Sequence, residues 1–266
     1  MNKTGFDFEN YPRNQKLDIQ PKTLKTGTTI AAAVFDGGVV LGADTRATAG
    51  PVVAVKDEYK IHYISDNIWC CGAGTAADND EITRLISSKL RLFTMNTGMQ
   101  PRVYQCAQIL AARLFKYMGY IGAYLIVAGV DFQGPSAYTI YANGSCSKSP
   151  FTTLGSGSMA AVSVLEQRWR SKMSEADCKE LVADAIEAGI TNDLGSGSCV
   201  NLCVIKNTGH EYISHYRVTN ERQFRMNMPS RIGTVEVIST VTKPLHAKEV
   251  HLDILDDAPP AEAPAQ

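Results

Sequence analysis

The chain has 266 residues, of which 44% are hydrophobic and 20% charged, and its formal net charge at pH 7 is −1. This length predicts one large or two small domains with a sizeable buried core. The near-neutral charge gives no electrostatic reason to expect binding to nucleic acid or to an acidic membrane surface. The seven cysteines are odd in number and irregularly spaced. We therefore expect reduced thiols and a location in the cytoplasm or nucleus.

The N-terminal segment, residues 1–24, mixes acidic and basic side chains and has no apolar run. This composition predicts neither a secretory signal nor a transit peptide. The most apolar uncharged stretch, residues 117–130, contains glycines and is shorter than the roughly 20 residues that a membrane-spanning helix needs. We expect residues 1–27 to be a removable polar leader and no part of the chain to cross a membrane.

Short β-rich runs follow the leader. Residues 29–35 and 39–43 flank the sequence Asp36-Gly37-Gly38, and residues 60–64 and 68–71 flank a second polar turn. Strand-like runs that border such turns predict two β-hairpins. The pattern then changes, because apolar side chains recur at helical spacing. This period predicts two consecutive helices, over residues 82–93 and 103–118.

The second half repeats this order. Strands are expected over residues 123–132 and 137–141, helices over 160–169 and 174–190, and strands over 199–205 and 211–218. Ser174 and Asp177 resemble a capping box at the start of the last helix. Strands, two helices, strands, two helices and strands predict an α+β fold. Specifically, we expect a four-layer αββα sandwich, in which helices cover both outer faces of two packed antiparallel sheets.

A polar arm follows the predicted domain. We divide the chain into a leader (1–27), a domain (28–220) and a C-terminal arm (221–266). Within the arm, residues 234–241 alternate in polarity and are suited to adding a strand to a neighbouring protein. The Pro- and Ala-rich end is expected to be disordered.

Three residues near the start of the domain suggest a chemical reaction. Thr28 follows Gly27, Asp44 follows the second predicted strand, and Lys60 opens the third. A threonine hydroxyl is a weak nucleophile and needs a base. A cut between Gly27 and Thr28 would supply one, since a free α-amine has a pKa of ~7.7–8.0. Each residue also has a plainer interpretation: a strand threonine, a solvated lysine and a turn carboxylate.

Six segments together carry a family resemblance: Thr26-Gly27-Thr28-Thr29-Ile30, Gly42-Ala43-Asp44-Thr45-Arg46, Lys60, the run from Cys71 to Asp78, Gly155-Ser156-Gly157-Ser158, and the run from Asp193 to Ser198. They closely resemble the eukaryotic proteasome β subunits, in particular the type credited with trypsin-like cleavage. The resemblance is collinear from Thr26 to about residue 250. Any one of these motifs alone would be weak.

The resemblance implies a threonine protease of the N-terminal-nucleophile hydrolase family. Thr28 is similar to the nucleophile, exposed when the propeptide is removed at Gly27. Lys60 is similar to the lysine beside it, and Asp44 to the carboxylate that pairs with that lysine. The backbone N–H of Gly74 corresponds to the oxyanion donor, although Gly74 also suits an ordinary turn from sheet to helix. A polar cluster around the Thr28 amine is carried over from the family: Ser156, Asp193 and Ser196.

The same resemblance places Gly72, Glu58 and Asp80 on the wall that receives the substrate side chain. A glycine there leaves depth, and two carboxylates attract a basic side chain, so cleavage after arginine or lysine is expected. Glu58 departs from the small residue expected at its position. The plainer interpretation of both carboxylates is a solvated loop residue and a helix-start acid.

The resemblance also implies partners: other β and α subunits in stacked seven-membered rings, with unfolded polypeptides as substrates. Two alternatives remain, an inactive structural subunit of such rings and a homomeric amidohydrolase acting on small amides. We expect no cofactor. The sequence lacks a phosphate-binding Gly-x-x-x-x-Gly-Lys-Ser/Thr string, and its five histidines have no zinc-site spacing with the cysteines.

Overall fold

Two five-stranded antiparallel sheets form the centre of the computed structural model, which describes residues 26–219, 233 and 239–242. The first sheet has the order β10-β1-β2-β11-β12 and the second β5-β6-β7-β8-β9. The strands of the first sheet are β1 (Thr29–Phe35), β2 (Gly38–Asp44), β10 (Phe151–Gly155), β11 (Cys199–Lys206) and β12 (Gly209–Val218). Those of the second are β5 (Ile61–Ser65), β6 (Ile68–Gly74), β7 (Ala123–Asp131), β8 (Gly134–Ile140) and β9 (Cys146–Ser149).

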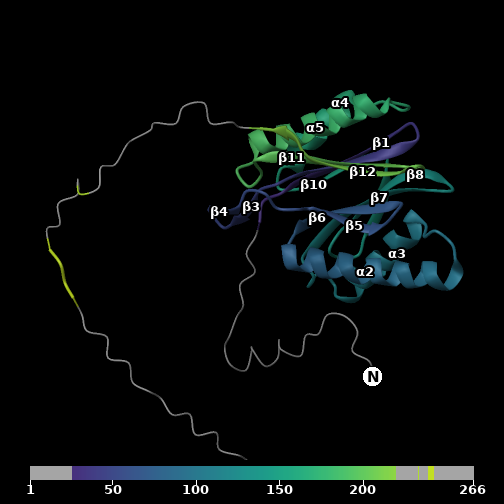
Figure 1. Ribbon diagram of the computed structural model, residues 1–266, viewed down its shortest axis with the longest axis horizontal. Coiled ribbons are helices and arrows are strands. Elements are labelled where there is room, and N and C mark those ends of the chain that lie inside the picture. The colour runs from purple at the N-terminus through teal and green to yellow at the C-terminus, as the bar shows by residue number, and fades with distance from the viewer. Residues whose placement is uncertain (1–25, 220–232, 234–238, 243–266) are drawn as a thin grey trace, which may run out of the picture. The chain divides into compact units, whose positions relative to one another are not determined.

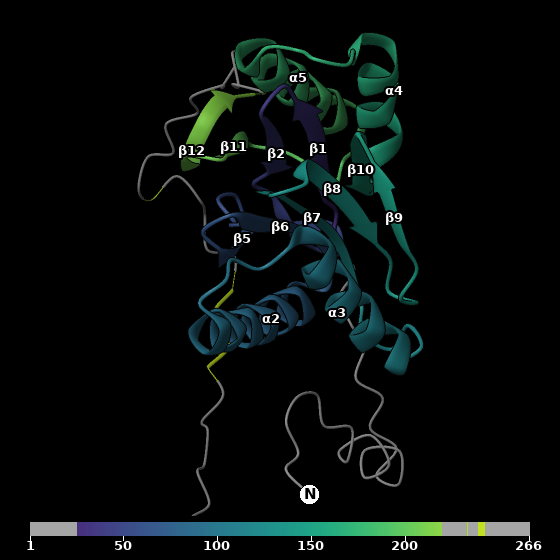
Figure 2. The ribbon, with the colours of Figure 1, turned by 90° about the vertical axis from the view of Figure 1, so that its right-hand side faces the viewer.

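Each sheet has its own pair of helices. Helices α2 (Ala76–Thr97) and α3 (Val103–Lys116) pack on the second sheet. Helices α4 (Ser158–Arg168) and α5 (Glu175–Asn192) pack on the first. Figures 1 and 2 show the two sheets lying between these helix pairs. The predicted α+β chain with antiparallel sheets and two pairs of helices is therefore confirmed.

Among the described residues, the core consists of three clusters of buried side chains. One cluster, which includes Ile30, Leu41 and Ile126, fills the space between the sheets. A second joins α2 and α3 to the second sheet, and a third joins α4 and α5 to the first. Alternate residues of one strand belong to different clusters: Ala32 packs between the sheets, while Ala31 and Ala33 pack under α5. Both faces of β1 are thus buried, so its sequence has no polar alternation.

The helix predicted over residues 82–93 is longer than expected, since α2 begins at Ala76 and ends at Thr97, while the other three helices begin within two residues of their predicted starts. Ser174 is the N-cap of α5, and its hydroxyl accepts a hydrogen bond from the backbone N–H of Asp177. The expected capping arrangement is therefore confirmed. The approach of α5 to β1 depends on Gly189, because a Cβ there would lie 2.5 Å from Cγ2 and Oγ1 of Thr29.

Four strands were not predicted. β3 (Ala47–Ala49) and β4 (Val52–Val55) form a small separate hairpin, while β9 and β10 lie at edges of the two main sheets. All are short; β9 (CSKS) is polar and β10 (FTTLG) mixes polar and apolar residues, so none of the four gives a long periodic pattern. The strand expected over residues 137–141 begins earlier, at Gly134. It tolerates Pro135 because this proline lies at its start.

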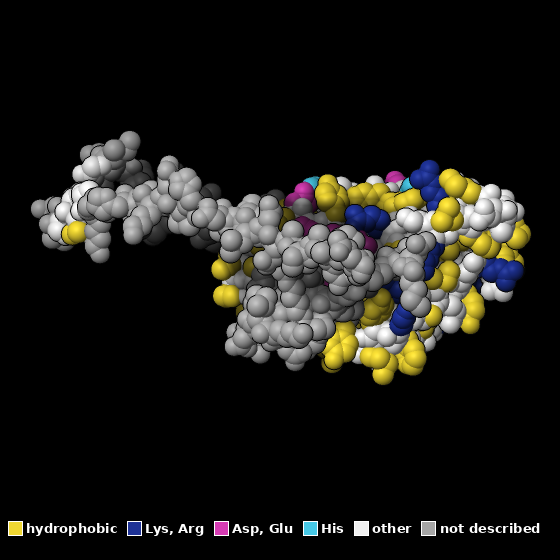
Figure 3. Space-filling view, turned by 90° about the horizontal axis from the view of Figure 1, so that it is seen from below, with side chains coloured by type: hydrophobic (Ala, Val, Ile, Leu, Met, Phe, Trp, Pro, Cys, Tyr) yellow, Lys and Arg dark blue, Asp and Glu magenta, His cyan; other side chains and the backbone are white. Residues whose placement is uncertain are grey.

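The outer face of α2 and α3 remains partly apolar. Figure 3 views the molecule from the side of these helices and shows hydrophobic side chains among lysines and arginines. Leu92, Met95, Phe115 and Met118 are each more than half exposed. In the described part of the chain, no helix is long and apolar enough to span a membrane.

Contacts divide the chain into Met1–Arg222 and Gln223–Gln266. Residues 1–25 of the leader, most of the C-terminal arm, and the predicted strand over 234–241 apart from 239–241 lie outside the described residues.

Candidate active site

Thr28 lies immediately before β1 and is almost completely buried, with 4% of its surface exposed. Its backbone N–H donates to Ser156 Oγ at 3.0 Å. Its hydroxyl donates to the Gly27 carbonyl oxygen at 2.6 Å. The hydroxyl of Thr28 is thus held against the peptide group that precedes it.

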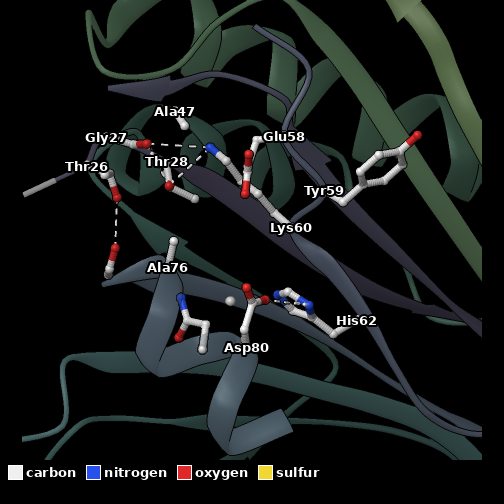
Figure 4. A pocket seen from close by; sticks show the side chains of 13 residues that line it. Thr26, Gly27, Thr28, Ala47, Glu58, Tyr59, Lys60, His62, Ala76 and Asp80 are labelled. Carbon is white, nitrogen blue, oxygen red and sulfur yellow. Dashed lines mark hydrogen bonds and ion pairs between the residues drawn. The ribbon is translucent and has the colours of Figure 1, made fainter. Parts of the chain in front are cut away.

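Lys60 approaches Thr28 from the end of the segment before β5. Its Nζ lies 3.1 Å from Thr28 Oγ1 and 3.5 Å from the Gly27 oxygen. It also donates to Asp44 Oδ1 and to the Arg46 carbonyl, each at 2.7 Å. Figure 4 shows the Lys60 ammonium reaching toward Gly27 and Thr28. Only 7% of the Lys60 side chain is exposed, which excludes a solvated lysine at this position.

Asp44 is fully buried at the end of β2 and connects four parts of the site. Besides Lys60, three backbone N–H groups donate to its carboxylate: Thr29 at 2.9 Å, Arg46 at 3.2 Å and Gly197 at 3.1 Å. A buried carboxylate is stable only when its oxygens are paired in this way. Asp44 therefore fixes the ammonium of Lys60 relative to Thr28.

Burial lowers the pKa of Lys60 below its usual value, because the charged ammonium loses water. The attraction and hydrogen bond of Asp44 oppose this shift without cancelling it, and Glu58 and Asp193 add weaker attraction. The lysine thus combines a nearby counter-ion with a reduced cost of losing its proton. Such a group suits proton transfer to or from the threonine hydroxyl.

A second polar cluster lies on the other side of Thr28. Ser156 Oγ, which accepts from Thr28 N, donates to Asp193 Oδ2 at 2.5 Å. Ser196 Oγ donates to the same oxygen at 2.7 Å, and Gly195 N donates to Asp193 Oδ1 at 3.1 Å. Partial burial raises the pKa of Asp193, but these hydrogen bonds outweigh burial and leave the pKa below its ordinary value. Asp193 is thus held as a carboxylate.

One pocket contains most of the residues chosen from the sequence. Thr28, Lys60, Glu58 and Asp80 line it, as Figure 4 shows, and so do Gly72 and Gly74. The other four do not line the pocket. Asp44 contacts Lys60 and Ser156 contacts Thr28, while Asp193 and Ser196 are joined to Ser156 by hydrogen bonds to or from Asp193. Seven lining residues were not predicted: Thr26, Gly27, Ala47, Tyr59, His62, Ala76 and Asn79.

Two pocket residues that were not predicted, His62 and Asn79, add polar side chains to the pocket wall. His62 was assigned no role, yet its ring lies 3.5 Å from Asp80 Oδ1. Its position had a signal, because His62 follows Lys60 by two residues and alternate residues of a strand share a face. Burial lowers the pKa of His62, and Asp80 opposes that shift. No comparable spacing pointed to Asn79.

Gly72 does not add open depth, contrary to expectation. A Cβ at this position would lie 2.8 Å from Asn79 Cγ, so the glycine makes room for the Asn79 side chain. Asn79 itself is buried, with 4% of its surface exposed. Beside Gly72, the side-chain amide of Asn79 therefore forms the pocket wall, where the sequence predicted open space.

The side chains at this pocket include groups that can act on a substrate. No group of three or more metal-ligating side chains occurs within residues 26–219 or the other described positions. A nucleophilic hydroxyl, a buried ammonium and a carboxylate adjoin a pocket that carries two further carboxylates. This arrangement can perform acyl transfer.

Comparisons with known proteins agree on one family. Residues 24–205 match the family model described as proteasome subunit. The chain is 49% identical over 260 residues to proteasome subunit beta type-7 of Dictyostelium discoideum, covering 96% of this chain and 98% of that protein. It is 48% identical to proteasome subunit beta type-2 of Saccharomyces cerevisiae, covering 82% of this chain and 86% of that protein. It is 51% identical to proteasome subunit beta type-10 of Rattus norvegicus, covering 76% of each chain.

Proposed function

Because this chain belongs to the proteasome subunit family, we propose that it is a catalytic β subunit of the proteasome core particle. It is a threonine-type endopeptidase that cleaves peptide bonds after basic residues. The observation that carries this proposal is the contact of the buried Lys60 ammonium with both Asp44 and the Thr28 hydroxyl. A subunit that serves only assembly has no need for this arrangement.

Activation removes residues 1–27. In the uncut chain the Thr28 hydroxyl touches the Gly27 carbonyl oxygen, and Lys60 contacts both atoms. Attack of Thr28 Oγ on the Gly27 carbonyl carbon transfers the leader to oxygen and frees the Thr28 nitrogen. Hydrolysis of the resulting ester then releases the leader. Until that step the Thr28 nitrogen is an amide and cannot act as a base.

Peptide cleavage repeats this chemistry on another chain. The freed amine of Thr28 takes the hydroxyl proton as Oγ attacks the substrate carbonyl, and then passes the proton to the leaving amine. Lys60, oriented by Asp44, favours the neutral amine and stabilises the developing alkoxide. The Gly74 N–H donates to the carbonyl oxygen, and Ser156, Asp193 and Ser196 hold the amine and the hydrolytic water.

The carboxylates of Glu58 and Asp80 select the substrate. Both line the pocket that opens in front of Thr28; Glu58 attracts the Lys60 ammonium only weakly, and Asp80 lies 3.5 Å from the His62 ring. A basic side chain before the cut bond would therefore be attracted into this pocket.

The remaining features concern the whole chain. The two sheets and their helix pairs constitute the four-layer αββα sandwich of N-terminal-nucleophile hydrolases, bounded by a propeptide (1–27) and a C-terminal arm (221–266). The arm contacts a neighbouring subunit. The exposed apolar residues on α2 and α3 also favour assembly with other α and β subunits. The relatives come from eukaryotes, and we place this chain in the cytoplasm and nucleus.

The test uses core particles that contain either the wild-type chain or Thr28→Ala. We expect wild-type particles to contain a chain beginning at Thr28 by mass spectrometry, and Thr28→Ala particles to retain residues 1–27. The variant should lose at least about a thousandfold of the turnover of tripeptide substrates that end in arginine. Particles should still assemble.

Each outcome discriminates between the alternatives. A wild-type chain that still begins at Met1, with arginyl turnover unchanged by Thr28→Ala, would identify an inactive structural subunit. Faster turnover of a leucyl or glutamyl peptide would contradict the basic preference. A native mass that corresponds to copies of this chain alone would favour a homomeric amidohydrolase.

A further inference from the structure

Asn79 carries a polar atom that the protein itself does not use. The residue lies in the first turns of α2, is 96% buried, and lines the pocket beside Gly72 and Asp80. Its side-chain oxygen is buried and has no hydrogen-bond partner among the described residues. Native proteins pair nearly all such atoms, because an unpaired buried acceptor reduces stability. This exception requires a reason.

The helix does not supply that reason. The backbone N–H of Asn79 donates to the Thr75 carbonyl at 3.1 Å, and its carbonyl accepts from Thr83 Oγ1 at 2.7 Å. The backbone groups of Asn79 are thus satisfied, and only the side-chain amide is left over. A leucine has nearly the same shape as asparagine and would fill this space without an unpaired acceptor.

We propose that the side-chain amide of Asn79 is a specificity-determining group that accepts a hydrogen bond from the basic side chain of the substrate. This inference rests on the function proposed above. A Cβ built at Gly72 would lie 3.0 Å from Asn79 Nδ2, so a turn of the amide about its Cβ–Cγ bond brings the oxygen to the Gly72 side of the pocket when a donor enters.

The proposal also separates arginine from lysine. Asp80 is 66% exposed and lies 3.5 Å from the His62 ring, so it attracts either cation through solvent. A guanidinium presents five N–H donors in a planar fork, which can reach an amide oxygen and a carboxylate together. An ammonium is a compact point charge and matches this pair less well. Asn79 therefore favours arginine before the cut bond.

The test is Asn79→Leu in assembled core particles, with Asn79→Ala as a second variant that adds no bulk. Three tripeptide substrates differ only in their last residue, which is arginine, lysine or leucine, and turnover of Thr28→Ala particles is subtracted. We expect kcat/KM for the arginyl peptide to fall about tenfold, mainly through KM, and the arginine-to-lysine ratio to fall at least about threefold. Turnover of the leucyl peptide should not fall, and the Tm of the particle should stay equal or rise.

Thr83→Val is the matched control, because it removes a buried hydroxyl one turn along α2 whose hydrogen bonds are already made within the helix. It should leave the arginine-to-lysine ratio unchanged. An unchanged ratio in both Asn79 variants, or an equal loss on all three peptides together with a lower Tm, would overturn the proposal and leave Asn79 a packing residue. If Thr28→Ala does not reduce arginyl turnover, the proposed function itself fails.

Discussion

At the scale of single residues, the Asp44–Lys60 pair connects stability to chemistry. Both side chains are buried, and the pair contacts the Thr28 hydroxyl directly. Removing one member of a buried pair leaves a charge without its partner, which is more destabilising than removing both. The pair is therefore expected to behave as a unit in mutagenesis.

We predict that Lys60→Met abolishes peptidase activity and destabilises the subunit by about 3 kcal/mol, the lower end of the usual range for breaking a buried pair. The lower value is expected because three backbone N–H groups still bind Asp44. The double variant Asp44→Asn/Lys60→Met should recover part of the stability and none of the activity. Thermal unfolding and the yield of assembled particles measure the effect, and a double variant less stable than Lys60→Met would contradict it.

His62 makes the proposed basic preference depend on pH. Burial holds the pKa of His62 below the ordinary value of 6.5, so the ring is neutral above that pH and Asp80 keeps its charge for the substrate. As the pH falls below 6.5 toward the lowered pKa, the ring gains a proton and competes for Asp80. The unfolded chain takes up this proton first, so the folded state also loses stability over the same interval.

We therefore expect the arginine-to-leucine ratio of kcat/KM to decrease about two- to tenfold as the pH falls below 6.5 through the lowered pKa of His62, an effect of the size of one screened charge interaction. His62→Gln should flatten this dependence and leave the ratio at pH 7.5 close to that of the wild type. A wild-type ratio that is constant over this interval would contradict the role of His62.

At the scale of secondary-structure elements, the contact between α5 and β1 should make glycine more stable than alanine at one helix position. Glycine within a helix is usually less stable than alanine by about 1 kcal/mol. At Gly189 we expect Gly189→Ala to destabilise by about 1–3 kcal/mol, because the new Cβ would overlap Thr29. The double variant Gly189→Ala/Thr29→Ala should recover much of that loss. Denaturant unfolding measures both, and a stabilised single variant would show that the helix shifts freely.

The elements also show what a sequence can and cannot indicate. The helices and buried strands could be predicted because burial of their faces gives the apolar residues a regular spacing along the chain. The short strands β3, β4, β9 and β10 were not. β3 and β4 pair with each other and β9 pairs with β8, but strands of three or four residues give too short a pattern to recognise. β10 instead pairs with β1, more than a hundred residues earlier. Such pairing leaves little trace in the local pattern.

At the scale of the whole molecule, the candidate site is assembled from both sheets. Thr28, Asp44 and Lys60 could be chosen from the sequence because they occur in collinear motifs. Asn79 could not, because its importance depends on an unpaired atom and on its contact with Gly72, neither of which spacing reveals. His62 lies between these cases, since strand alternation placed it beside Lys60.

The links made by Asp44 and Asp193 also bear on how the protein is synthesised. Asp44 binds the backbone of Gly197, and Asp193 binds Ser156 and Ser196. A nascent chain therefore presents Thr28 to the cell long before the ribosome has released the residues that complete its surroundings. The residues that complete these contacts end at Gly197, just before β11, so translation must reach this point before Thr28 has its full set of partners.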